Sequence, residues 1–148
     1  MHLIALLCAC VFFSTSAGAA DAKEMDSITV LADARLAATL SELASLYSHR
    51  NMISVSATFG ESEAQKKKIE DGESADIYIT PDMLLVQELK VKGMVDFNSI
   101  GRLASFKDAH FVAAVIAGEN MSAGRKFLKF LKTDEAHNVF KKNGFSIP

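Results

Sequence analysis

The chain of 148 residues contains no tryptophan, two prolines, two cysteines and few aromatic side chains. The shortage of flat aromatic rings argues against a surface that stacks sugars or nucleic-acid bases. The formal net charge is −2, so the composition gives no sign of a nucleic-acid or anionic-membrane partner. A chain of this length is enough for one domain.

Residues 1–19 have the pattern of a secretory signal peptide. An apolar core runs from Leu3 to Phe13, and Ala17-Gly18-Ala19 fits an A-x-A cleavage site. We therefore expect cleavage before Ala20 and a periplasmic or otherwise exported protein. An uncleaved membrane anchor and lipid attachment at Cys10 stay open as alternatives.

Both cysteines, Cys8 and Cys10, lie in this leader. The exported chain would then have no thiol, no disulfide and no cysteine-based metal site. Its stability must come from a hydrophobic core, for which its length is sufficient.

Signals of catalysis are poor. The three histidines beyond the leader, His49, His110 and His137, lie far apart without metal-ligand spacing. The chain has no G-x-S-x-G, H-E-x-x-H or Walker-type motif. We predict that the protein is not an enzyme and needs no cofactor.

Strand and helix patterns alternate along the chain. Short strands are expected at 27–32, 53–59 and 75–79, each followed by a helical segment. Consecutive strand–helix units imply right-handed crossovers, so we predict an α/β fold with a mostly parallel sheet and helices on both faces. The apolar run 110–118 predicts a buried final strand, expected to be antiparallel, and two C-terminal helices follow.

The helices carry recognisable ends and faces. Leu36, Leu40, Leu43 and Tyr47 fall on one face of the first helix, with Asp33 as its N-cap.

In the second helix, Ala64 and Ile69 are expected to point inward, with Gly72 as the stop. Thr80 is expected to cap the third helix, and Thr133 the last one. Residues 95–109 show no clear period and are expected to be a connection.

The strand-to-helix turns are where a parallel sheet binds ligands. The free amides at a helix start, here 34–36 and 61–63, suit a small tetrahedral oxyanion. The predicted ligands are Ser62, Arg35, Ala34 and Glu63.

Each of these residues also has a purely structural interpretation. Ser62 could be a first-turn or capping hydroxyl, and Arg35 could pair with Asp33 or face solvent. Asp33 is expected to be a cap rather than a catalytic acid. Glu61 and Glu63 flank Ser62 and would repel an anion unless their side chains point away.

Three segments, in order, resemble the periplasmic molybdate-binding proteins of ABC transporters, which have the type 2 periplasmic binding fold. "ITVLADARL" resembles that family's first strand and its "TVFAAASL" turn. "FGESEAQKKKIEDGESADIYITPD" resembles its "F-G-x-S-x-x-L-x-x-Q-I-x-x-G-x-x-A-D-[VL]-F-I-S-A-D" segment. "FVAAVIAGENMSAGRKFLKFLKTDEAHNVFKKNGFSI" resembles its last strand and two C-terminal helices.

The resemblance implies a two-lobed clamp that holds an oxyanion with hydroxyls and backbone amides and docks on a membrane permease. The serine of the family's first turn falls on Arg35, and the serine of its second turn falls on Ser62. The family's second lobe is inserted between Phe97 and Ala109, where this chain has only a short connection. Residues 20–148 are therefore expected to form a single lobe, in which 27–97 and 110–148 are joined by that connection.

Two functions from different classes remain. The first is an exported solute-binding protein of an ABC transporter that binds molybdate, with tungstate or sulfate as other tetrahedral oxyanions. The alternative is a single lobe that has lost its ligand and serves as a protein-interaction or self-associating module, with apolar hinge surface exposed around Ile100 to Val115.

Overall fold

A computed structural model describes residues 26–148 of the chain. The expected signal peptide at 1–19, with Cys8 and Cys10, lies outside the described residues. None of the helices among the described residues is long and apolar enough to cross a membrane.

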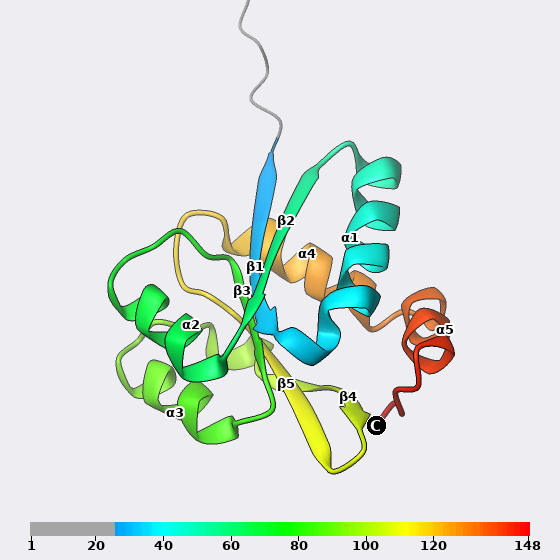
Figure 1. Cartoon of the computed structure of the whole chain (residues 1–148). Helices are drawn as coiled ribbons and strands as arrows, with labels where there is room; N and C mark the ends of the chain where they lie inside the picture. The colour runs from blue at the N-terminus through cyan, green and yellow to red at the C-terminus, as the bar shows by residue number, and fades with distance from the viewer. Residues whose placement is uncertain (1–25) are drawn as a thin grey trace, which may run out of the picture.

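The described residues form five strands, five α-helices and two short 3₁₀ turns (Figure 1). Strands and helices alternate as far as α3, after which two strands and then two helices follow in succession. In order they are β1 Ser27–Asp33, η1 Ala34–Leu36, α1 Ala37–Asn51, β2 Ser54–Gly60, α2 Ser62–Glu70, β3 Ile77–Thr80, α3 Met83–Val91, η2 Phe97–Ser99, β4 Gly101–Phe106, β5 Ala109–Val115, α4 Met121–Leu131 and α5 Asp134–Lys142.

The strands form one mixed sheet in the order β2-β1-β3-β5-β4. β1 pairs in parallel with β2 and β3, while β5 pairs antiparallel with β3 and β4. The predicted α/β class and the antiparallel orientation of the strand at 110–118 are therefore confirmed.

Each face of the sheet has its own hydrophobic core. α1, α4 and α5 cover one face, where Leu43, Phe127 and Phe140 are fully buried against the strands. α2 and α3 cover the other face, where Tyr78 and Leu89 are buried. Alternate residues of a strand point to opposite faces, which is why Tyr78 serves the second core and its neighbours in β3 serve the first.

The predicted face of the first helix is confirmed, because Leu36, Leu40, Leu43 and Tyr47 are all buried. The predicted cap of the last helix is also confirmed, since Thr133 Oγ1 accepts a hydrogen bond from the Ala136 N–H.

Two details of the second and third helices were predicted wrongly. Ala64 is exposed, and Gln65 is buried in its place. The N-cap of α3 is Asp82, whose side chain accepts from the Leu84 N–H, because the chain enters the helix two residues later than Thr80. Thr80 Oγ1 instead accepts from the Asp82 N–H.

The prediction of an irregular connection at 95–109 is wrong, because this segment holds η2 and β4. β4 has an irregular register between Arg102 and Ala104, and both Leu103 and Ala104 are buried. A bulge of this kind breaks the alternation by which a strand is recognised in a sequence.

The expected apolar hinge surface around Ile100 to Val115 is also absent from the described structure. Phe111 to Val115 are buried in the middle of the sheet. The C-terminal residues cover the far side of β4, where Phe145 packs 5.1 Å from Phe106, centre to centre.

Candidate functional site

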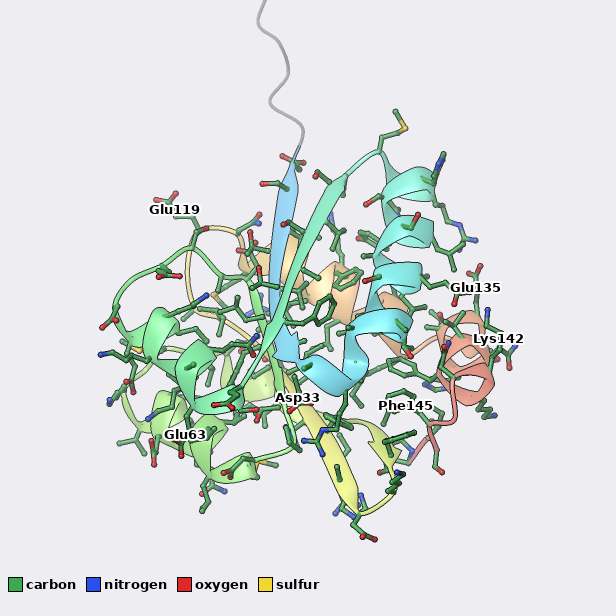
Figure 2. All side chains as sticks on the ribbon, viewed as in Figure 1. Asp33, Glu63, Glu119, Glu135, Lys142 and Phe145 are labelled. Atoms are coloured by element: carbon green, nitrogen blue, oxygen red, sulfur yellow. The ribbon has the colours of Figure 1, made fainter. Side chains whose placement is uncertain are left out.

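The carboxyl ends of β1, β2 and β3 meet at one end of the sheet, as expected for a parallel arrangement. Asp33 at the end of β1 lies beside Gly60 at the end of β2. Figure 2 shows Asp33 where β1 passes into the first helix, with Glu63 on the side of α2. The β4–β5 hairpin extends at this same end of the sheet (Figure 1).

In the first turn, Asp33 and Arg35 satisfy each other. Asp33 Oδ1 accepts from the Arg35 backbone N–H at 3.0 Å and from Arg35 Nε at 2.8 Å, and Asp33 Oδ2 accepts from an Arg35 terminal nitrogen at 3.0 Å. The guanidinium also lies over the Phe111 ring, 5.3 Å from its centre. Arg35 therefore pairs with Asp33, the structural alternative considered for it, and its charge is already compensated.

The pairing also controls ionisation. Burial alone raises the pKa of Asp33, but the hydrogen bonds from Arg35 outweigh it, and the pKa of the carboxyl is lowered overall. The side-chain hydrogen bond to Asp33 in turn raises the pKa of Arg35. Asp33 thus stays charged at neutral pH as the cap of the first turn.

In the second turn, Ser62 is the first residue of α2, after the N-cap Glu61, which makes no capping bond with its side chain. The Ser62 hydroxyl is buried and has no hydrogen-bond partner among residues 26–148. It therefore lies in the first turn of the helix without acting as a cap.

The backbone donors of this second turn are also open. The N–H of Gln65 is the first in α2 with a partner, the Glu61 carbonyl at 3.1 Å. The N–H groups of Ser62, Glu63 and Ala64 have no acceptor among the described residues, as expected at the start of a helix. Together with the Ser62 hydroxyl they form a cluster of donors at the positive end of the helix dipole.

Tyr78 holds the backbone of this turn in place through a hydrogen bond. Its hydroxyl donates to the Ser62 carbonyl at 2.7 Å. Burial, partly offset by hydrogen bonds to Thr80 and Ser62, raises the pKa of Tyr78 to about 12. Tyr78 is therefore a neutral donor that holds the backbone of Ser62 in place.

Gln65 is a site residue that the sequence analysis missed. Its side-chain Nε2 donates to the Ala32 carbonyl at 2.8 Å and to the Thr58 carbonyl at 3.0 Å, so it ties the ends of β1 and β2 together. Its Oε1 is buried without a partner among the described residues. The family pattern quoted above has leucine at this position, which indicates a buried side chain but not the acceptors that a glutamine there would bind.

The remaining predicted ligands lie at the surface. Ala34, Arg35 and Glu63 are exposed, and so is Glu61. The two glutamates make no ion pair among the residues described. The structure therefore brings the turns of Ser62 and Arg35 to one end of the sheet, but among the described residues only the Ser62 turn has a buried side-chain donor without a partner.

Other chemistry is limited in residues 26–148. No cluster of three histidine, cysteine or acidic side chains could hold a metal there. The hairpin brings Ser105 Oγ to 2.7 Å from His110 Nδ1, a pairing that the sequence analysis did not foresee. These two residues are opposite each other on β4 and β5, so the bond is an ordinary cross-strand contact.

A second place could attract anions. Arg125, Lys129 and Lys132 line a hollow of about 320 Å³ beside η2. Asp96 Oδ2 accepts from Arg125 Nε at 2.7 Å and compensates that charge, whereas the lysines have no carboxylate partner among the described residues. Any binding experiment must therefore separate this hollow from the Ser62 turn.

The fold and this turn define the class of protein as an α/β protein with unpaired donors at the carboxyl end of its sheet. A model of the bacterial extracellular solute-binding protein family matches residues 28–105, which is more than half of the chain. The chain belongs to this family of bacterial extracellular solute-binding proteins.

Solved structures support the fold. The substrate-binding domain assigned to a molybdenum ABC transporter of Clostridium difficile matches with a TM-score of 0.77 at 11% identity, covering 82% of this chain and 99% of that chain. The periplasmic molybdate-binding protein of Azotobacter vinelandii matches with a TM-score of 0.72 at 11% identity and the same coverage. The sulfate-binding protein SubI of Mycobacterium tuberculosis matches with a TM-score of 0.70 at 12% identity, covering 81% of this chain and 86% of that chain. No curated protein matches the sequence.

Proposed function

We propose that the protein is exported and binds a small tetrahedral oxyanion at the start of α2 for delivery to an ABC permease. Molybdate is the first candidate, with tungstate and sulfate as the other members of the class. The family membership supports solute binding, and the structurally similar proteins include molybdate and sulfate binders.

One observation carries the proposal. The buried Ser62 hydroxyl and three backbone N–H groups of the same turn lack acceptors among the described residues. An unpaired buried hydroxyl costs stability, so an acceptor that arrives with a ligand would be bound favourably. A dianion supplies such acceptors and is also favoured by the helix dipole.

Access to Ser62 limits the affinity. Its hydroxyl oxygen is covered, so an anion reaches it only after the side chain turns to another staggered rotamer. Glu61 and Glu63 are exposed beside the turn, and their carboxylates repel a bound anion. Solvent and salt weaken this repulsion.

We also propose that the exported chain forms a single lobe rather than a two-lobed clamp. In the described residues β4 passes directly into β5 through Lys107 and Asp108. This turn lies within the segment where the molybdate-binding proteins that the chain resembles have their second lobe inserted. An anion on one lobe stays hydrated on its far side, and enclosure is what gives such sites affinity and size selection. We therefore expect weaker binding than a closed clamp would give.

Calorimetry of the purified protein with molybdate, tungstate and sulfate tests this function. We expect heat that saturates at millimolar ligand for at least one of the three anions. The double variant Lys129→Gln/Lys132→Gln is the matched control, because it removes the competing cations without touching the turn. The proposal is contradicted if none of the three anions gives saturable heat. It is also contradicted if the wild type gives saturable heat and the Lys129→Gln/Lys132→Gln variant does not.

A further inference from the structure

The two edges of the sheet are protected very differently. At the β4 edge, Ser105 and Ser146 exchange two backbone hydrogen bonds of 2.8 Å, so the C-terminal segment covers part of the strand. β4 also carries the exposed charge of Arg102 and an irregular register beside it. Bulges, charges and covering segments are the usual features that keep an edge strand from pairing with another chain.

The β2 edge has none of these protections. β2 is Ser54–Gly60, a strand of 7 residues without charge, proline or bulge, and it pairs in continuous register with β1. Among residues 26–148 no segment pairs with its other side. Figure 1 shows β2 running uncovered down the middle of the view, between α1 and α2.

The hydrogen bonds of β2 show which backbone groups are open. The Ser54 N–H donates to the Asp26 carbonyl, so it points toward the neighbouring strand. Neighbouring residues of a strand direct their backbone groups to opposite sides, so Val55, Ala57 and Phe59 point outward. The Val55 N–H confirms this, because it donates to Ser48 Oγ of α1 rather than to β1. The open groups are the N–H of Ala57 and Phe59 and the carbonyls of all three residues.

We propose that a second copy of this chain pairs with β2 in antiparallel orientation, about a two-fold axis at Ala57. Ala57 would exchange two hydrogen bonds with Ala57 of the second copy, and each Phe59 N–H would donate to a Val55 carbonyl. This makes about four intermolecular bonds and leaves the bond between Val55 and Ser48 intact. The inference rests on the sheet edge and is independent of any ligand.

The side chains of β2 fit this register. On the face toward α1, Val55 would lie opposite Phe59 of the second copy, and Ala57 opposite Ala57. On the exposed face, Ser56 would lie opposite Thr58. Aromatic–β-branched pairs and hydroxyl pairs are favourable neighbours across strands, and no charge opposes a like charge.

The surroundings also leave room for a neighbouring strand. A hollow of about 330 Å³ lies at the start of β2, lined by α1 residues Ser48 and His49 and by 52–55. Met52, 73% exposed, stands at its rim. The two-fold would bring the turn at Gly60 of the second copy to this rim.

The expected dimer is weak. A strand pair with its adjoining side chains buries less than the ~1,200 Å² of a standard interface. We therefore expect a dissociation constant between about 1 μM and 1 mM. Sedimentation equilibrium over that concentration range should show the transition from monomer to dimer.

A charge-swap pair tests the register. Ser56→Lys with Thr58→Lys places lysine opposite lysine across the two-fold and should raise the dissociation constant about tenfold. Ser56→Lys with Thr58→Glu places opposite charges there and should restore dimerisation. Both positions are exposed, so circular dichroism should show unchanged folding in both variants.

Two outcomes overturn the inference. One is a wild-type protein that stays monomeric up to about 1 mM. The other is a dimer that the lysine–lysine variant leaves unchanged, which would move the contact elsewhere, for example to the exposed Leu84 and Val91 of α3.

Discussion

The two turns at the carboxyl end of the sheet differ in how far their polar groups are already paired. In the first turn, Asp33 accepts from the backbone and side chain of Arg35, and the guanidinium packs on Phe111. In the second, the hydroxyl of Ser62 and the oxygen of Gln65 are buried without partners among the described residues. A turn whose polar side chains pair with each other is structural, whereas a turn with a buried, unpaired hydroxyl such as Ser62 can still donate to a ligand.

Ser62→Ala should have the largest effect, since among the described residues it removes the one buried side-chain donor of this turn that lacks a partner. A hydrogen bond to a charged ligand contributes about 1.5–3 kcal/mol, so oxyanion affinity should fall by about tenfold to a hundredfold. Calorimetry of the variant measures this. Ser41→Ala, an exposed serine of α1, is the control and should keep wild-type affinity. Equal affinity in both variants would remove Ser62 from the site.

Gln65→Ala should be the most destabilising of the changes at the turns. It leaves the carbonyls of Ala32 and Thr58 without their shared donor, at a cost of about 1–3 kcal/mol in the free energy of unfolding. Urea denaturation is the measurement, and Gln87→Ala, at an exposed position of α3, should lie within about 0.5 kcal/mol of wild type. If both variants unfold alike, Gln65 does not tie the two strands together.

Asp33→Asn should lower the free energy of unfolding at neutral pH, because it removes the charge that pairs with Arg35 in the first turn. The expected loss is only about 1 kcal/mol, since Arg35 is half exposed and solvent screens the pair. The pKa of Asp33 is lowered in the folded protein, so this stability is present above the ordinary pKa of 3.8 and lost as pH falls through the folded value. The stability difference between wild type and variant should therefore shrink below about pH 4.

The control for this change is Asp108→Asn in the exposed hairpin turn, which has no ion pair among the described residues. Thermal melts of wild type and both variants over this pH range are the measurement, and Asp108→Asn should stay within about 0.5 kcal/mol of wild type at neutral pH. A wild-type advantage over Asp33→Asn that persists at the lowest pH would contradict the assignment of the pair.

Glu61→Gln with Glu63→Gln should have the smallest effect, a rise in oxyanion affinity of up to about fivefold, because exposed charges interact weakly through solvent. Glu73→Gln with Glu119→Gln makes the same charge change far from the turn; Figure 2 shows Glu119 well away from Asp33. A rise of equal size in both double variants would show only the effect of net charge. Unchanged or weaker binding in the first variant would count against the site.

Much of the fold could be predicted from the sequence, because the buried faces follow simple periods. Leu36 to Tyr47 repeat at helical spacing, and the apolar run at 110–118 is long enough for a buried strand. β4 could not be predicted, since its irregular register buries Leu103 and Ala104 together and hides the alternation.

The candidate site was predicted only in part, because the pairing of polar groups depends on distances between segments. The turns of Arg35 and Ser62 were found from their position after strands. That Arg35 is paired while Ser62 is open follows only from the arrangement in space. Gln65 was missed because its two acceptors, on β1 and β2, are 33 and 7 residues away along the chain.

Amide NMR spectra recorded during a titration with molybdate test the central claim most directly, because every backbone N–H reports its own surroundings. The account predicts that the largest shift changes fall on Ser62, Glu63 and Ala64, with smaller ones at Arg35. Changes that are absent at millimolar molybdate, or that centre on Lys129 and Lys132, would contradict it.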